Sequence, residues 1–467
     1  MAQNLRKFWW ILVFVMFGLS VFGGFVQDDR LIGVNPNFGK MESLFDAWVE
    51  PYFFGDKMAG AYRPITSLSY NLTGVFFGLV PFWYRLGNLI IYLVLVWQVI
   101  KLVERILGNK YWWVGLWWGV MAIHTEAVVN VVGRGEVLSM LGVIMMMRCL
   151  QEKRWEAGLV WWLLGLLAKE SAMVWGVYLL WNLKGVEVKK VLVRLYYFGL
   201  VVGGYFLLRF NALGESMFSN NATMVENQLK FLGLGDRLIS AISLITLGLQ
   251  KVILPISLSY DYSFNQLGEV FGNRWYFYGG VLVIISLILL MVKFRKIRMG
   301  ILMLALPLLL TSNLIMPIGT VFGERLWLFP SLGVAVIISW LIREKIIGKF
   351  ILVALIFANI ILGIIRVWSW RSEDSLFMAD ARVSSNSVVA LTNMSATLLK
   401  QRKLDEAYEY LKKAEGIYPD YPILLNNMGL YYYWKGEIDL ARGKWDRCVA
   451  LVPGHKLCGS NLELLKK

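Results

Sequence analysis

Charged side chains are scarce in this sequence, and the shortage excludes most classes of soluble protein. Asp, Glu, Lys and Arg make up 17% of the 467 residues, whereas hydrophobic residues make up 58%. A soluble domain of this size would need more charge to cover its surface. Several runs are apolar enough to cross about 30 Å of hydrocarbon. The sequence therefore predicts a polytopic, all-α membrane protein with the lipid bilayer as a partner.

Cysteine and histidine are also rare, which excludes several kinds of site. The chain has 3 Cys and 2 His, and their spacing matches no metal site and no disulfide framework. Cys448 and Cys458 could form a bridge outside the cytosol or could be unpaired packing residues. The chain has no Walker loop, no Rossmann glycine pattern after a strand and no nucleophile elbow. We expect no metal ligands and no cofactor among its residues, although a divalent-metal requirement stays open.

The excess of basic residues is explained by membrane topology. A net charge of +15 would suggest a nucleic-acid partner in a soluble protein. Here the Lys and Arg residues gather in short loops between apolar runs, where they orient the spans. We expect no nucleic-acid partner.

The apolar runs predict about 11 crossings. The first run, 8–26, follows Arg6 and Lys7 and is long for a signal peptide, so we interpret it as an uncleaved first helix that starts in the cytosol. A long outer loop, 27–85, comes next. The other expected spans are 86–103, 111–123, 131–147, 157–168, 172–183, 195–208, 275–292, 299–316, 326–342 and 350–366.

One further apolar run, 237–254, is expected not to cross. A crossing there would export Lys293, Arg295, Lys296 and Arg298, together with Arg343 and Lys345, against the positive-inside pattern. If the segment 237–254 does not cross, the N-terminus is cytosolic and the C-terminal part lies outside the cytosol. We expect a multi-pass protein of the cell membrane, or of the endoplasmic reticulum with a luminal C-terminal part if the source is eukaryotic.

The C-terminal part has the composition of a soluble helical domain and an internal repeat. Asn393-Met394 recurs as Asn427-Met428, and Pro419 recurs as Pro453, each 34 residues later. These positions are typical of tetratricopeptide repeats. We expect a membrane domain over 1–370 and a repeat domain over 371–467, with repeats at 388–421 and 422–455 and a terminal helix. Two repeats are few for an isolated solenoid, so the module should lean on the membrane domain.

Charges near the outer ends of the spans are the candidate functional residues, because charge at membrane depth is costly. Adjacent carboxylates suit a general base that takes a proton from a hydroxyl, although such a pair is more often a solvated helix end. Guanidinium and ammonium groups suit an anionic phosphate, and a lone histidine is as often a core residue as a functional one. The candidate bases are Asp28 and Asp29; the candidate phosphate ligands are Arg134, Lys169, Arg63 and Arg325; supporting residues are His124, Glu126, Glu136, Glu170 and Glu324.

Several segments together resemble the transmembrane and tetratricopeptide-repeat-containing O-mannosyltransferases. They are Tyr62-Arg63-Pro64-Ile65-Thr66, Leu86-Gly87-Asn88-Leu89, His124-Thr125-Glu126-Ala127-Val128 with Gly133-Arg134-Gly135-Glu136, Ala168-Lys169-Glu170-Ser171, Leu258-Ser259-Tyr260-Asp261-Tyr262-Ser263 and Glu324-Arg325-Leu326-Trp327. The resemblance covers nearly the whole chain and is specific as a set. It implies the C-type glycosyltransferase architecture, in which Asp28 and Asp29 match the acidic motif of the first outer loop.

The resemblance also implies a reaction. The expected activity is an inverting transfer of a sugar, usually mannose, from a dolichyl- or polyprenyl-phosphate carrier to a Ser/Thr hydroxyl outside the cytosol. The partners would be the lipid-linked sugar and an acceptor protein or peptide, which the repeats could bind. The chain has fewer repeats than eukaryotic members and has Met121-Ala122 where the family has His-Pro. The low number of repeats makes this compact chain look more like a prokaryotic relative, whose carrier would be a shorter polyprenyl and whose acceptor need not be a protein.

Two other functions compete with this interpretation. An O-antigen-ligase-like transferase would use polyprenyl diphosphate glycans and outer-loop Arg and His residues, and would not need the Asp pair. A non-enzymatic scaffold that presents the repeats to partners would have no reason to keep charged clusters beneath the outer surface.

Overall fold

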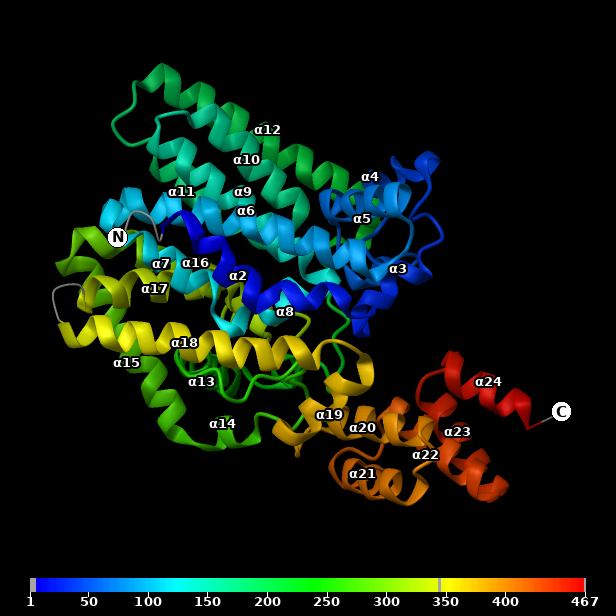
Figure 1. Cartoon of the computed structure of the whole chain (residues 1–467). Helices are drawn as coiled ribbons and strands as arrows, with labels where there is room; N and C mark the ends of the chain where they lie inside the picture. The colour runs from blue at the N-terminus through cyan, green and yellow to red at the C-terminus, as the bar shows by residue number, and fades with distance from the viewer. Residues whose placement is uncertain (1–5, 343–345, 466–467) are drawn as a thin grey trace.

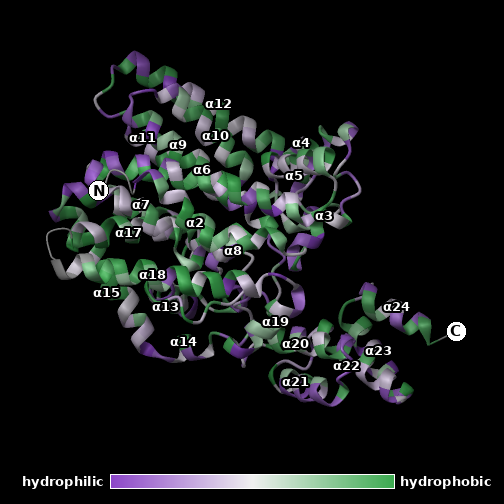
Figure 2. Cartoon of the chain, viewed as in Figure 1, coloured by the Kyte–Doolittle hydropathy of each residue, from purple (hydrophilic) through white to green (hydrophobic). Residues whose placement is uncertain are grey.

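The computed structural model describes residues 6–342 and 346–465, and all regular secondary structure in these ranges is helical. The all-α expectation is therefore confirmed. Figure 1 shows a bundle of long helices with a smaller C-terminal group of helices at one end. Figure 2 shows that the bundle helices are mostly hydrophobic, whereas hydrophilic residues are frequent in the smaller group and at the ends of the bundle.

The bundle contains long helices and several short ones that cap its ends. The first half consists of α2 (Trp9–Phe17), α3 (Arg30–Val34), α4 (Asp46–Val49), α5 (Pro64–Phe77), α6 (Pro81–Leu107), α7 (Trp112–Gly119), α8 (Thr125–Val129), α9 (Arg134–Gln151), α10 (Trp155–Ala168), α11 (Gly176–Trp181) and α12 (Val188–Leu213). The second half consists of α13 (Leu234–Ile253), α14 (Gly268–Gly272), α15 (Arg274–Lys293), α16 (Arg298–Thr311), α17 (Leu328–Ile342) and α18 (Ile346–Ser369).

Among the described residues, five helices are long and apolar enough to cross a membrane, or up to seven if each of two bent pairs counts as one span. The five are Pro81–Leu107, Val188–Phe218, Arg274–Lys293, Glu324–Ile342 and Phe350–Ser369. The expected 11 crossings are not confirmed, because helices such as α10 and α16 have only 14 residues each and rise about 21 Å. Arg343 and Lys345, expected in a cytosolic loop, lie outside the described residues.

Short helices pack closely because glycines face each other. A Cβ on Gly142 of α9 would lie 2.7 Å from the Cα of Gly165 on α10. Such close approach of two backbones is typical of helix contacts in membranes, where packing replaces the hydrophobic driving force.

Basic connections gather at the end of the bundle where α2 begins. Arg6 pairs with Glu104 at 2.8 Å, Arg105 with Glu152 at 2.5 Å, and Arg194 with Glu156 at 3.2 Å. These pairs tie together the ends of α6, α9, α10 and α12. The repeat module lies at the opposite end of the bundle (Figure 1).

Helix α13, the segment expected not to cross, is not among the candidate spans of the described residues. The loops before and after it meet, since the Phe264 amide donates to the Val225 carbonyl at 2.9 Å. The side chains of Val225 and Phe264 both pack against the repeat module. This arrangement supports a helix that begins and ends on one side of the bilayer, which stays a prediction.

The C-terminal module consists of α19 (Glu373–Val383) followed by two helical hairpins and a last helix. The hairpins are α20 (Val388–Lys400) with α21 (Leu404–Ile417) and α22 (Pro422–Lys435) with α23 (Ile438–Leu451), and α24 spans Lys456–Leu464. Small residues also recur 34 positions apart, Ala407 as Ala441 and Ala414 as Cys448, and all four are fully buried where the helices touch.

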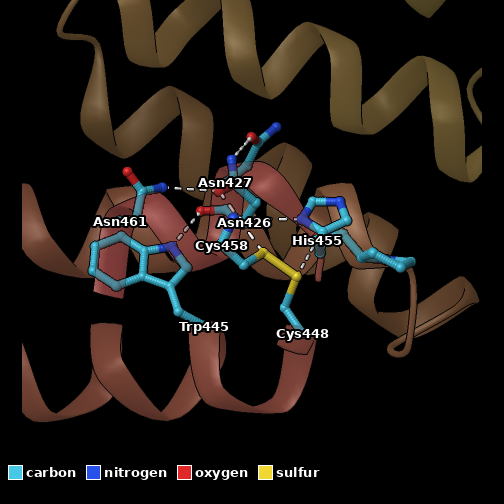
Figure 3. Close-up of a disulfide and its surroundings, with 8 residues drawn as sticks. Asn426, Asn427, Trp445, Cys448, His455, Cys458 and Asn461 are labelled. Carbon is cyan, nitrogen blue, oxygen red and sulfur yellow. Dashed lines mark hydrogen bonds between the residues drawn. A yellow bond between two sulfur atoms is a disulfide. The ribbon is translucent and has the colours of Figure 1, made fainter. Parts of the chain in front are cut away.

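A disulfide between Cys448 and Cys458 joins α23 to α24 (Figure 3). The sequence left open whether these two cysteines are bridged or unpaired, and in the structure they are bridged. Beside it, the Asn461 side chain donates to Asn426 at 2.9 Å and Trp445 donates to the Asn426 carbonyl at 3.1 Å. The bridge therefore fastens the last helix to the second hairpin.

Candidate active site

The structure brings most of the candidate residues together at the end of the bundle that carries the repeat module. The central group is Asp28, Glu126 and Arg325, which come from three separate segments. One terminal nitrogen of Arg325 lies 3.2 Å from Glu126 and 3.8 Å from Asp28. The Arg325 amide also donates to Glu126 at 2.9 Å. Glu126 is almost fully buried and therefore fixes both the backbone and the side chain of Arg325.

The two adjacent aspartates have different environments. Gln27 has a left-handed φ of 53° and is the first residue of the short 3-10 helix Gln27–Asp29. This turn directs Asp29 into the protein, where its carboxylate accepts the amides of Val26 at 3.3 Å and Val132 at 3.1 Å. The Asp28 side chain stays 43% exposed, and among the described residues its one ion pair is the long contact with Arg325. Asp28 is therefore the carboxylate that an external hydroxyl can reach.

Arg325 lines a small pocket of about 30 Å³ between helices of the bundle. Its polar side chains are Glu136, Ser139, Ser171, Thr311 and Arg325, and its apolar ones include Met140, Val143, Trp175, Pro307, Leu328 and Phe329. The rings of Trp175 and Phe329 are stacked 4.5 Å apart. The pocket thus has a polar end at Glu136 and Arg325 and apolar walls.

Two further ion pairs surround this polar end. Lys169 pairs with Glu136, and Arg63 makes two hydrogen bonds with Glu170, at 3.1 and 2.7 Å. Burial by itself would raise the pKa of Glu170, but the charge of Arg63 outweighs burial and holds that pKa below its usual value. Burial lowers the pKa of Lys169, although the charge of Glu136 raises it. Lys169 is the more available cation, since Arg63 is held bidentately and also stacks 4.8 Å over the Tyr52 ring.

Arg134 occupies a different environment from the other three cations. Its guanidinium donates to Asn88, Ser69, Thr73 and the Tyr84 carbonyl, and it stacks over the rings of Tyr70 and Tyr84. Only 1% of the residue is exposed. In this position Arg134 holds α5 and α6 against α9, and a phosphate would have to displace these bonds to reach it.

His124 and Glu324 are also engaged inside the protein. The two ring nitrogens of His124 lie 2.8 Å from the Tyr92 hydroxyl and 2.8 Å from the Ser331 hydroxyl, which is the environment of a core histidine. Glu324 is fully buried and accepts the Ser259 amide and the Tyr262 hydroxyl, both at 2.6 Å. Glu324 therefore anchors the segment Leu258–Ser263 instead of facing the pocket.

Sequence reasoning missed Tyr260, Arg366 and Asp380. Arg366 sits in an apolar span and pairs with Asp380 at 2.9 Å, and both are nearly buried. Arg366 also lies within electrostatic range of Glu126 and Glu324. The cost of charge at membrane depth could have identified Arg366. Tyr260 lies in the segment Leu258–Ser263, whose resemblance to the family could have identified it.

The chain is similar to curated protein O-mannosyl-transferases. It is 25% identical over 471 residues to protein O-mannosyl-transferase TMTC3 of Homo sapiens, covering 86% of this chain and 50% of that protein. It is 24% identical over 501 residues to TMTC1 of Homo sapiens, covering 88% of this chain and 55% of that protein. A 137-residue stretch is 31% identical to TMTC2 of Mus musculus, covering 28% of this chain and 16% of that protein.

The similarity to these curated proteins extends over most of this chain, as the resemblance of its motifs implied. The chain spans about half the length of the first curated relatives it matches. A prokaryotic origin is unconfirmed. No family model matches the chain, and no solved structure matches it.

Proposed function

We propose that this chain is a membrane glycosyltransferase that moves a sugar, with mannose as the first candidate, from a polyprenyl-phosphate carrier to a Ser or Thr hydroxyl of a protein. The single observation that carries the proposal is the half-exposed Asp28 carboxylate beside Arg325, which itself lines a pocket between helices of the bundle. The protein O-mannosyl-transferase names of its homologues supply the sugar and the class of acceptor.

In the proposed reaction, Asp28 acts as general base. It takes the proton of the acceptor hydroxyl as the hydroxyl oxygen forms a bond to the anomeric carbon of the sugar. The bond between that carbon and the phosphate oxygen breaks, and the carrier leaves as polyprenyl phosphate. Because the displacement is single, the anomeric configuration inverts. Arg325 and Lys169 neutralise the charge that develops on the leaving phosphate.

The reaction is proposed to take place outside the cytosol. The basic connections of the bundle lie at the end opposite the repeat module, as the positive-inside rule requires if that module is outside. The Cys448–Cys458 bridge in the module also fits an oxidising compartment. Asp28, Arg325 and the repeats would then share the extracytoplasmic face.

The test is a transfer assay with the purified full-length chain in detergent. Radiolabelled mannosyl-phosphoryl-polyprenol and a Ser/Thr-rich peptide should give labelled peptide, and Asp28→Asn should abolish most of the signal. A matched control is Glu42→Gln, an exposed carboxylate of the same outer loop. Transfer only from a polyprenyl diphosphate glycan would instead favour a ligase. Absence of transfer from a panel of polyprenyl-phosphate sugars would overturn the proposal in favour of a scaffold.

A further inference from the structure

The segment Leu258–Ser263 links the candidate active site to the repeat module. We propose that Tyr260 forms one wall of the acceptor site beside Asp28, and that Asp380 of α19 holds it there as a positioning residue. The repeat module would then shape the acceptor site directly and would not only recruit an acceptor. This inference rests on the proposed function, because it assigns the substrate subsite of the same centre.

Tyr260 has a free donor, and its neighbour Ser259 donates its amide at 2.6 Å to Glu324, the residue that precedes Arg325. The side chain is half-buried, and within the described ranges its hydroxyl has no hydrogen-bond partner. Its phenol lies within electrostatic range of Asp28 and Arg325, and burial, followed by the charge of Asp28, raises the pKa of Tyr260 well above its usual value. The phenol therefore stays protonated and can donate to a substrate oxygen. Its ring packs edge-on against Trp370, with centroids 5.7 Å apart.

The backbone that carries Tyr260 is clamped from both sides. On the bundle side, Glu324 accepts the Ser259 amide and the Tyr262 hydroxyl. On the module side, Asp380 accepts the Tyr260 amide at 2.9 Å, and its other oxygen is held by Arg366 at 2.9 Å. A buried carboxylate that joins a loop amide to an arginine fixes the loop more firmly than a neutral contact would.

The first repeat hairpin is occupied by the chain's own loops. Val225 and Phe264 are part of its hydrophobic cluster, and the rings of Phe264 and Tyr418 are 5.4 Å apart. Next to Tyr260, the side chains of Ser263 and Ser387 lie 3.3 Å apart. This surface of the module is therefore used to hold the loops that border the site.

The chemistry assigns an extended Ser/Thr-containing peptide to the subsite. The Tyr260 hydroxyl would donate to a backbone carbonyl of the peptide, and its ring would cover the peptide on the side away from the pocket. The acceptor Ser or Thr hydroxyl of a peptide held in this way would already lie beside Asp28, so less freedom is lost at the moment of transfer. The donor phosphate would stay at Arg325, on the other side of Asp28.

The experiment separates acceptor effects from donor effects. Tyr260→Phe should raise the acceptor KM about five- to tenfold, because one hydrogen bond is lost, and should leave the donor KM unchanged. Asp380→Asn should raise the acceptor KM as well, and combining it with Tyr260→Phe should add little if Asp380 acts through Tyr260. The control is Tyr433→Phe, an exposed tyrosine of the same module.

A direct binding measurement makes the inference independent of turnover. A fluorescein-labelled Ser/Thr-rich peptide should bind the Tyr260→Phe protein about five- to tenfold more weakly than the unmodified protein. Peptide affinity and acceptor KM that are unchanged in Tyr260→Phe would overturn the inference. An unmodified protein that binds the peptide through Tyr260 but transfers no sugar would support the subsite and contradict the proposed function.

Discussion

The carboxylate of Asp28 lies 3.8 Å from the guanidinium of Arg325. The two residues come from the connection after the first apolar helix and from the start of the tenth expected span. A third residue, Glu126, is closer to Arg325, so the guanidinium is fixed even when Asp28 moves. Asp28 is therefore the member of this group that can change partners during a reaction.

Replacement of Asp28 tests catalysis. Asp28→Asn keeps the shape of a half-exposed side chain but removes the base, so we expect turnover to fall by a factor on the order of 10² to 10⁴. Melting temperature should stay close to that of the unmodified protein. Near-full activity of the purified variant would show that another group takes the proton.

Replacement of Asp29 tests positioning. The two oxygens of Asp29 each accept a hydrogen bond from a backbone amide. An asparagine has only one side-chain oxygen, so one of these two hydrogen bonds would be lost. Asp29→Asn should therefore destabilise the fold by about 1–3 kcal/mol, which a thermal melt in detergent would detect. If stability is unchanged and only turnover falls, then Asp29 rather than Asp28 is the candidate base.

The donor site can be mapped by comparing cations. Arg325→Ala and Lys169→Ala should raise the donor KM, because an anion in a site of low dielectric constant loses a partner. Arg134→Ala should mainly lower the melting temperature, since this guanidinium is consumed by internal bonds. A selective rise in donor KM for Arg134→Ala, with normal stability, would place the phosphate at Arg134 as the sequence first indicated.

Stability should depend on pH through Asp261. Burial, aided by the charge of Asp380, raises the pKa of Asp261 from 3.8 to about 6. The folded state therefore holds this proton more tightly than the unfolded state, and the carboxylate costs stability increasingly as pH rises from about 4 to 6. Asp261→Asn should stabilise the protein by about 1–2 kcal/mol at pH 7.5 and by less at pH 4.5. Thermal melts at both pH values give the comparison, and an equal gain at both would contradict it.

Membrane topology can be tested by cysteine labelling of intact cells. Ser385→Cys in the module and Lys296→Cys in the basic connection are both exposed positions. In a Cys149→Ser background, which removes the free cysteine of the described residues, a membrane-impermeant maleimide should label only Ser385→Cys. The bridged pair Cys448–Cys458 should not react. Labelling of Lys296→Cys alone would place the module in the cytosol and separate it from the proposed reaction.

The sequence by itself predicted the class of protein and most members of the candidate site. Apolar runs and the shortage of charge require a membrane helix bundle whatever the details of packing. The cost of charge at membrane depth pointed to Asp28, Glu126, Lys169 and Arg325, which do lie near one another. The helices of the module follow from repeated small residues, because a small side chain is needed wherever two helices touch.

Only the tertiary structure distinguished residues of the same chemical type. Asp28 and Asp29 are identical in sequence terms, but the turn at Gln27 leaves one exposed and buries the other. Arg134 and Arg325 looked equivalent, yet four hydrogen-bond partners and two aromatic rings hold the first inside, while the second lines a pocket. The loop of Tyr260 is held in place by Glu324 and Asp380, which are distant from it in sequence. Exposure and hydrogen bonding depend on which segments meet, and no local pattern of residues contains that information.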